Sequence, residues 1–125
     1  MEQCITQAVF GEPLSSLYIP LKIVGNEKFP FTGISETGYS QVALVWNEAE
    51  RLFVEKTEKY PVHAEHSLKI SYVHMEKDKN GGARLYIPSG LKDEEDFPFE
   101  IPGNVLLSLD GEKERLILEK YKGGN

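Results

Sequence analysis

The sequence predicts a mainly β protein with short helices, in which two tandem strand-strand-helix-strand-strand repeats close into one pseudo-two-fold barrel. Three observations lead to this fold: an internal repeat, period-two alternation of apolar and polar residues, and turn signals between the alternating runs. We expect a single compact domain over residues 1–125, with repeat one at 1–57 and repeat two at 66–121. A repeat of about 50 residues is marginally stable alone, but two repeats can cover each other's apolar faces.

The repeat is clearest in two segments of fifteen residues. Residues 17–31 read LYIPLKIVGNEKFPF and residues 85–99 read LYIPSGLKDEEDFPF, with eight of the fifteen positions identical. Further matching segments are 42–46 with 105–109 and 50–56 with 114–120. The alignment requires a loop at 32–41 that is five residues longer than its counterpart, and one extra residue in the last hairpin turn of repeat two. Loops are where such length changes are tolerated.

Repeat two begins with two strands joined by a turn. Residues Leu68–Met75 alternate between apolar and polar side chains, which is typical of a half-buried strand. Residues Asp78–Gly82 are rich in types that tolerate positive φ and predict a turn. Arg84–Ile87 is the second strand, and it ends at Pro88 because proline cannot donate to a sheet ladder.

A short helix and a hairpin follow in repeat two. We expect Ser89 to cap a helical turn over Gly90–Asp96, with the acidic residues in its first turns. Phe97–Phe99 ends this turn and supplies two aromatic core anchors. The last elements are a strand at Val105–Leu109, a turn at Asp110–Gly111 and a return strand at Arg115–Leu118.

Repeat one is predicted to contain the same elements in the same order. Its strands are expected at 5–10, 17–19, 41–46 and 51–54, with the aromatic anchor at Phe29–Phe31. Residues Thr57–Ser67 then form a linker that is too short to separate free domains.

Composition and charge limit the class of protein. The net charge is −6, and each half of the chain carries −3, so there is no basic tail. The single cysteine, Cys4, excludes an intramolecular disulfide and fits a reducing compartment. The sequence has neither a signal-peptide pattern nor an apolar run near the roughly 20 residues of a membrane helix. We therefore expect a cytoplasmic protein with no membrane partner.

Repeat two resembles the AbrB/SpoVT/MazE family of swapped-hairpin proteins. The resemblance rests on Gly-Ala-Arg-Leu-Tyr-Ile-Pro at 82–88, Pro-Gly-Asn-Val at 102–105, Asp110–Gly111 and Leu-Ile-Leu-Glu-Lys at 116–120. It implies a barrel that two chains normally form by interleaving, here fused into one chain, and a DNA-binding transcription regulator or antitoxin-like function. The same strand order also resembles the related cradle-loop barrels, so a double-psi barrel is the alternative topology.

The candidate DNA-binding residues are Lys69, Lys77, Lys79 and Arg84. Lysines of this kind position a protein on phosphates, whereas an arginine can also contact a base edge. The resemblance implies the same role for Arg84, which matches the family's arginine before the second strand. Repeat one has Ser16 at the equivalent position, so a symmetric pair of arginines is missing.

The same cations have a simpler interpretation as solvated surface charge. Glu76 and Asp78 lie beside them in the sequence and could pair with them. Three further lysines in the expected helical segments could add phosphate contacts: Lys22, Lys28 and Lys92.

Other candidate chemistry is weaker. His63 and His66 have a spacing that metal ligands sometimes show, but neither they nor His74 have an evident third ligand, so we predict no metal. Phosphate-loop, nucleophile-elbow and metalloprotease motifs are missing from the sequence, and we predict neither an enzyme nor a cofactor. Cys4 and Trp46 are expected in or beside the core.

Two other functions remain open. One is a protein-interaction module on an AbrB-like barrel that has lost DNA binding and meets a basic partner through acidic surface such as Asp93–Asp96. The other is a barrel that recognises a small molecule or substrate. Either a monomer or a homodimer is compatible with the duplication.

Overall fold

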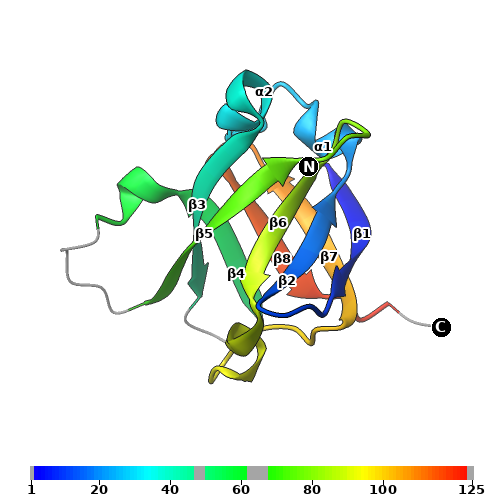
Figure 1. Cartoon of the computed structure of the whole chain (residues 1–125), viewed down its shortest axis with the longest axis vertical. Coiled ribbons are helices and arrows are strands. Elements are labelled where there is room, and N and C mark those ends of the chain that lie inside the picture. The colour runs from blue at the N-terminus through cyan, green and yellow to red at the C-terminus, as the bar shows by residue number, and fades with distance from the viewer. Residues whose placement is uncertain (1, 47–49, 62–67, 124–125) are drawn as a thin grey trace.

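Eight strands close into one barrel in which every neighbouring pair is antiparallel (Figure 1). The structure is a computed structural model, and it describes residues 2–46, 50–61 and 68–123. The mainly β barrel expected from the sequence is confirmed. The strands are β1 (Gln3–Val9), β2 (Leu14–Ile19), β3 (Tyr39–Trp46), β4 (Arg51–Lys56), β5 (Lys69–Lys77), β6 (Ala83–Pro88), β7 (Gly103–Asp110) and β8 (Arg115–Lys120). Around the barrel their order is β1-β2-β6-β5-β3-β4-β8-β7.

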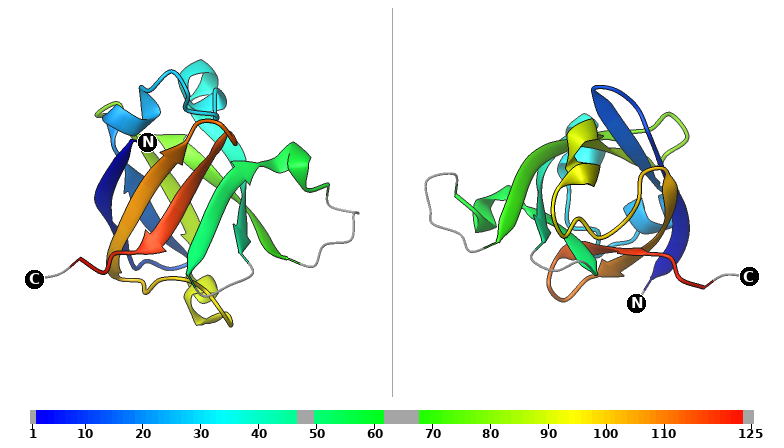
Figure 2. Two further views of the ribbon diagram at one scale, coloured as in Figure 1. Left: turned by 180° about the vertical axis from the view of Figure 1, so that it is seen from behind. Right: turned by 90° about the horizontal axis from the view of Figure 1, so that it is seen from below.

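Short helices lie at the two ends of the barrel. At one end are α1 (Leu21–Val24) and α2 (Gly33–Thr37), close to the turn between β5 and β6 (Figure 1). The 3₁₀ helix η2 (Ser89–Asp93) and the loop after it lie over the opposite end, which faces the viewer in the right-hand view of Figure 2. A second 3₁₀ helix, η1 (Thr57–Lys59), directly follows β4. Among the described residues, no helix is long and apolar enough to span a bilayer.

Strand pairing interleaves the two halves of the chain. Four pairings are hairpins within one half: β1–β2, β3–β4, β5–β6 and β7–β8. The other four join different halves: β1–β7, β2–β6, β3–β5 and β4–β8. Replacing each strand by its counterpart in the other half leaves this set of pairings unchanged. Neither half therefore has a sheet of its own.

The strand register follows the sequence alignment of the two repeats. Leu17 aligns with Leu85, and these two residues are Cα partners between β2 and β6. Phe53 aligns with Ile117, and these are Cα partners between β4 and β8. In both pairs, residues that the sequence alignment makes equivalent therefore lie opposite each other.

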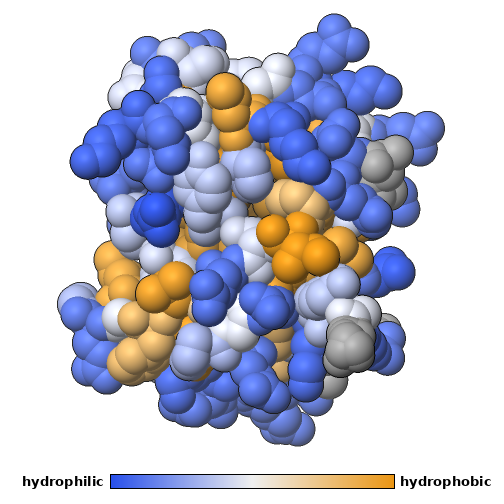
Figure 3. Space-filling model, turned by 90° about the vertical axis from the view of Figure 1, so that its right-hand side faces the viewer, coloured by the Kyte–Doolittle hydropathy of each residue, from blue (hydrophilic) through white to orange (hydrophobic). Residues whose placement is uncertain are grey.

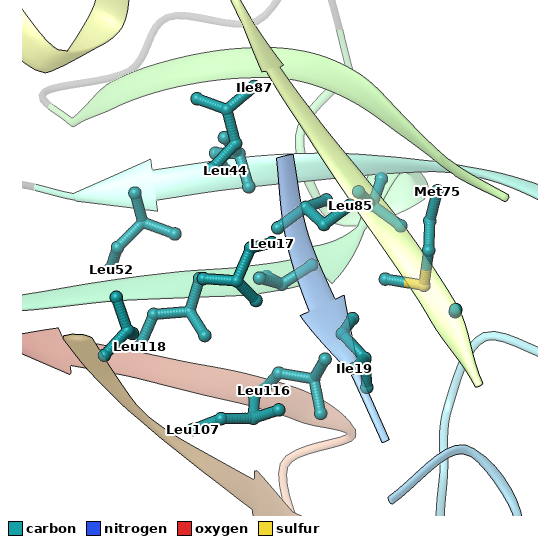
Figure 4. Close-up of a cluster of buried hydrophobic side chains, with 14 of the residues drawn as sticks. Leu17, Ile19, Leu44, Leu52, Met75, Leu85, Ile87, Leu107, Leu116 and Leu118 are labelled. Carbon is teal, nitrogen blue, oxygen red and sulfur yellow. The ribbon is translucent and has the colours of Figure 1, made fainter. Parts of the chain in front are cut away.

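The core fills the barrel interior with alternate residues of every strand. On β2 and β6, the inward residues Leu17, Ile19, Leu85 and Ile87 are completely buried, as period-two alternation requires. Figure 4 shows leucine and isoleucine side chains from opposite strands pointing toward one another, with Met75 beside them. Burying each such side chain contributes about 1.5–3 kcal/mol, so the core is the main source of stability.

The aromatic anchors lie where the sequence places them. Phe29, Phe31 and Phe99 are buried, and Phe97 packs against the core with its ring centroid 4.9 Å from that of Phe99. Trp46 is also a core residue, as expected.

Two expectations about the helices are wrong. Ser89 does not cap the helix of repeat two: it is the first residue of η2, Pro88 holds the N-cap position, and that cap makes no side-chain hydrogen bond. The helix ends at Asp93, so the acidic run follows it instead of forming its first turns. Repeat one has a second helix, α2, which was not predicted because it lies in the longer loop at 32–41, outside the repeat alignment.

Candidate nucleic-acid interface

The turn between β5 and β6 forms one corner of the candidate site, and its sequence explains its shape. The Asp78 N–H donates to the Gly82 carbonyl at 2.8 Å, and the Gly81 N–H donates to the Asp78 carbonyl at 3.0 Å. Gly81 has φ of +97°, a conformation that glycine adopts without strain. A Cβ on Gly82 would lie 2.5 Å from the Ile19 carbonyl oxygen, so a side chain there would push the turn away from β2.

Arg84 is held on the outer face of β6 by two contacts. Its Nη2 donates to Asp78 Oδ2 at 3.2 Å, and its side chain is 35% exposed. The guanidinium also lies over the ring of Tyr18, 5.6 Å from the centroid, on the neighbouring strand β2. Arg84 is therefore oriented and accessible, but it already has a carboxylate partner.

Lys77 and Lys79 flank that carboxylate in sequence and are both exposed. Lys77 ends β5, where its N–H donates to the Gly38 carbonyl at 2.8 Å. The Lys79 N–H donates to the other oxygen of Asp78 at 2.8 Å. Lys77, Lys79 and Arg84 thus share one end of the β5–β6 hairpin, beside α1 and α2 (Figure 1).

Lys69 does not join this group. It begins β5, about 26 Å along the strand from Lys77 at roughly 3.3 Å per residue. Its Nζ donates to the Glu95 carbonyl at 2.6 Å, in the loop after η2. An extended strand between Lys69 and Lys77 carries these two lysines to opposite ends of the barrel, so Lys69 is apart from the other three cations.

The three additional lysines also divide between the ends. Lys22, in α1, is near the hairpin turn, and its Nζ lies 4.0 Å from a Glu2 carboxylate oxygen. Lys28 lines an open, mostly acidic depression with Glu2, Glu27 and Glu112. Lys92 is in η2 at the opposite end.

Charge is unevenly distributed over the chain. Residues 69–88, the β5–β6 hairpin, contain four basic and two acidic side chains, whereas the remainder contains ten basic and eighteen acidic ones. The hairpin is therefore the one β hairpin of the described barrel with a net positive charge. A protein of net charge −6 can attract an anionic ligand only through such a local field.

An aromatic row that sequence analysis missed crosses the outer face beside these cations. Tyr39 of β3 stacks on His74 of β5, and His74 stacks on Tyr86 of β6, with ring centroids 5.5 and 5.0 Å apart. The repeated Leu-Tyr-Ile-Pro segment marks Tyr18 and Tyr86 as equivalent positions on two strands. Tyr39 belongs to no repeated segment, because it lies within the longer loop at 32–41.

A buried carboxylate lies beside β4, away from this face. Glu55 is only 5% exposed, and it accepts hydrogen bonds from the Tyr60 hydroxyl at 2.7 Å and from Lys59 Nζ at 3.2 Å. Desolvation, with the hydrogen bond to Glu55 as the next cause, raises the pKa of Tyr60 to about 12. A phenol with this pKa stays neutral at physiological pH, so the Tyr60 hydroxyl remains a donor to Glu55 and fixes the start of the linker.

Large apolar side chains are exposed on a different face. Ile5, Val9, Phe10 and Leu14 come from β1, its turn and β2. Figure 3 views the side on which β1 lies and shows the apolar groups separated by polar side chains. Their interruption by polar groups argues against one continuous docking face.

Metal ligands do not gather within residues 2–46, 50–61 and 68–123, where no three His, Cys, Asp or Glu side chains could hold an ion. His63 and His66 lie outside the described residues. His74 belongs to the aromatic row instead.

Comparison with protein-family models, with curated proteins and with solved structures finds no match to this chain. The likeness to swapped-hairpin proteins therefore rests on the short motifs of repeat two alone.

Proposed function

We propose that this protein binds DNA through the turn end of the β5–β6 hairpin, as a transcription regulator or antitoxin-like protein of the kind that the AbrB resemblance implies. The observation that carries the proposal is the grouping of Lys77, Lys79 and Arg84 at one end of the only positively charged hairpin among the described strands. The proposed role involves no catalysis, metal or cofactor.

Each cation has a distinct part in this proposal. Lys77 and Lys79 are exposed on both sides of Asp78 and would contact phosphates. Arg84 is oriented by the ring of Tyr18, over which its guanidinium lies, whereas its ion pair with Asp78 has to open before full contact with DNA. A planar guanidinium held in place is suited to a base edge or to a bidentate phosphate contact. Lys69 is omitted from the proposed interface, because it lies at the far end of β5.

The interleaved pairing supports the swapped-hairpin part of the proposal. The inter-half pairs β1–β7 and β3–β5 make each half of the barrel depend on strands from the other. That arrangement resembles a dimeric barrel whose two chains have been fused into one. Such a barrel would have two arginine sites, but this chain has one, because Ser16 stands at the position equivalent to Arg84.

The test is binding to a random pool of labelled DNA at about 50 mM and about 200 mM salt. Affinity should fall steeply with salt, and a Lys77→Ala, Lys79→Ala double variant should reduce the slope of log affinity against log salt by about two. Lys120→Ala is the matched control, because Lys120 is exposed on β8 and pairs with Glu100 at 3.3 Å. Absence of binding at the lower salt concentration would refute the proposal.

The acidic surface favours a second candidate, a protein-interaction module. The acidic run Asp93–Asp96 lies at the end of the barrel opposite the cations, where Lys92 pairs with Asp93 at 3.1 Å. Such a surface would favour a basic protein partner. Salt-sensitive binding to a basic protein that is lost in an Asp93→Asn, Glu94→Gln, Glu95→Gln variant, without any DNA binding, would select this function.

A further inference from the structure

The aromatic row on the barrel has a geometry suited to stacking. Tyr39, His74 and Tyr86 come from the adjacent strands β3, β5 and β6, and their rings are inclined by only 17° and 27° to one another. All three side chains face outward, because the neighbouring inward positions Met75 and Leu85 are completely buried. The row is thus a set of nearly parallel rings on the surface.

The ends of the row are open to a further ring. Tyr39 is 48% exposed, and among the described residues His74 is its one stacking partner. At the other end, Tyr86 has His74 on one side and faces Ser16 across the β2–β6 pairing. A planar group could therefore extend the row at Tyr39 or at Tyr86.

Tyr86 lacks the guanidinium that lies over its counterpart in repeat one, Tyr18. Tyr18 aligns with Tyr86, and Arg84 aligns with Ser16, so the cross-strand pairs Tyr18–Arg84 and Ser16–Tyr86 are equivalent. Arg84 lies over the Tyr18 ring at 5.6 Å. The serine side chain is too short to reach over a phenol ring in the same way, so Tyr86 lacks a guanidinium cover.

Cations border the row on the side toward α1 and α2. Arg84 is two residues from Tyr86 on β6 and on the same face. Lys77 is exposed at the end of β5, on the strand face opposite to that of His74, so it can reach a ligand only at the turn end of the row. Aromatic side chains beside lysine and arginine are the combination that binds single-stranded nucleic acid, since bases stack on the rings and phosphates contact the cations. A duplex cannot use the rings, because its base faces are already stacked.

We propose that this surface binds unpaired bases, so that the ligand is single-stranded nucleic acid, with one base on Tyr39 or Tyr86 and its phosphates on Lys77, Lys79 and Arg84. This inference rests on the proposed function and specifies which form of nucleic acid the hairpin recognises. Glu76 lies between Arg84 and Tyr39 in the strand register and limits how closely a phosphate can approach the centre of the row.

The test compares labelled 12-nucleotide strands with a duplex of the same length, by fluorescence anisotropy at about 50 mM salt. Oligo(dT) and oligo(U) present the same unpaired-base chemistry and distinguish DNA from RNA. We expect tighter binding to at least one single strand than to the duplex, and a loss of about fivefold to a hundredfold in Tyr39→Leu, the range expected for one stacked base. Tyr39→Phe, which keeps the ring, should restore the affinity.

Phe10→Leu is the matched control, because Phe10 is 43% exposed but lies in the turn between β1 and β2 at the other end of the barrel. Duplex binding at least as tight as single-strand binding, or an unchanged single-strand affinity in Tyr39→Leu, would overturn the inference. After either of these outcomes the proposed function would still stand if the Lys77→Ala, Lys79→Ala variant bound the duplex more weakly than the wild type does. Failure of every probe to bind would refute both.

Discussion

Replacing Asp78 with asparagine should strengthen DNA binding at the β5–β6 hairpin by about three- to tenfold. One Asp78 oxygen lies 3.2 Å from Arg84 Nη2, so Arg84 must leave a carboxylate before it can contact DNA fully. A partly exposed ion pair contributes about 0.2–1 kcal/mol, which corresponds to a factor of up to about five in affinity. The substitution also removes one negative charge next to the bound phosphates. Asparagine keeps a carbonyl oxygen for the Lys79 N–H at 2.8 Å, so the turn should persist.

The measurement is anisotropy of a bound oligonucleotide at about 100 mM salt, with Asp93→Asn as the control. Asp93 loses the same charge and also has a basic partner, Lys92 at 3.1 Å, but it lies at the opposite end of the barrel. An equal gain in both variants would show that only net charge matters. Weaker binding in Asp78→Asn would mean that the Asp78–Arg84 pair itself forms the binding geometry, which contradicts the assignment of Asp78 as a competitor.

Three further predictions concern stability. Leu85→Ala should lower the free energy of unfolding by about 2–5 kcal/mol in urea titrations, because Leu85 is completely buried in the core and its loss leaves a cavity. Gly82→Ala should lower the midpoint of thermal unfolding, since its Cβ would lie 2.5 Å from the Ile19 carbonyl; an unchanged midpoint would mean that the turn can move. Because the pKa of Tyr60 is raised to about 12 from 10, its stabilising contribution should be complete below about pH 10 and be lost as pH rises toward 12. Tyr60→Phe should abolish that part of the pH dependence, and a wild-type profile flat across this interval would argue against a pKa raised by burial and by the Glu55 contact.

The strands were predictable because their signals are local and occur twice. Alternation located β5, and the repeated Leu-Tyr-Ile-Pro segment located β2 and β6. Barrel closure followed from the need of two marginal units to cover each other. Helix α2 was missed because a helix of five residues has almost no periodic signal.

The candidate site was only partly predictable. The short distance in sequence between Lys77, Lys79 and Arg84 indicated correctly that a hairpin turn would bring them together. The separation of Lys69 depends on strand length, and the row of Tyr39, His74 and Tyr86 depends on the neighbour relation of β3, β5 and β6. That order places β3 of repeat one next to β5, on the outer side of the β5–β6 hairpin of repeat two. No local sequence pattern indicates such a pairing.

The interleaved barrel also determines when its edges can be covered during synthesis. Gln3 hydrogen bonds to Ser108, 105 residues further along the chain, so β1 has no partner on that side until β7 has been made. Likewise, β4 lacks its partner on one side until β8 has been made. Such distant pairings make folding slow, because the long chain segment between the two strands must lose conformational entropy before any stabilising contact between them forms. A ribosome that stalls before residue 103 would leave a chain with open strand edges, which is the form most prone to join another chain.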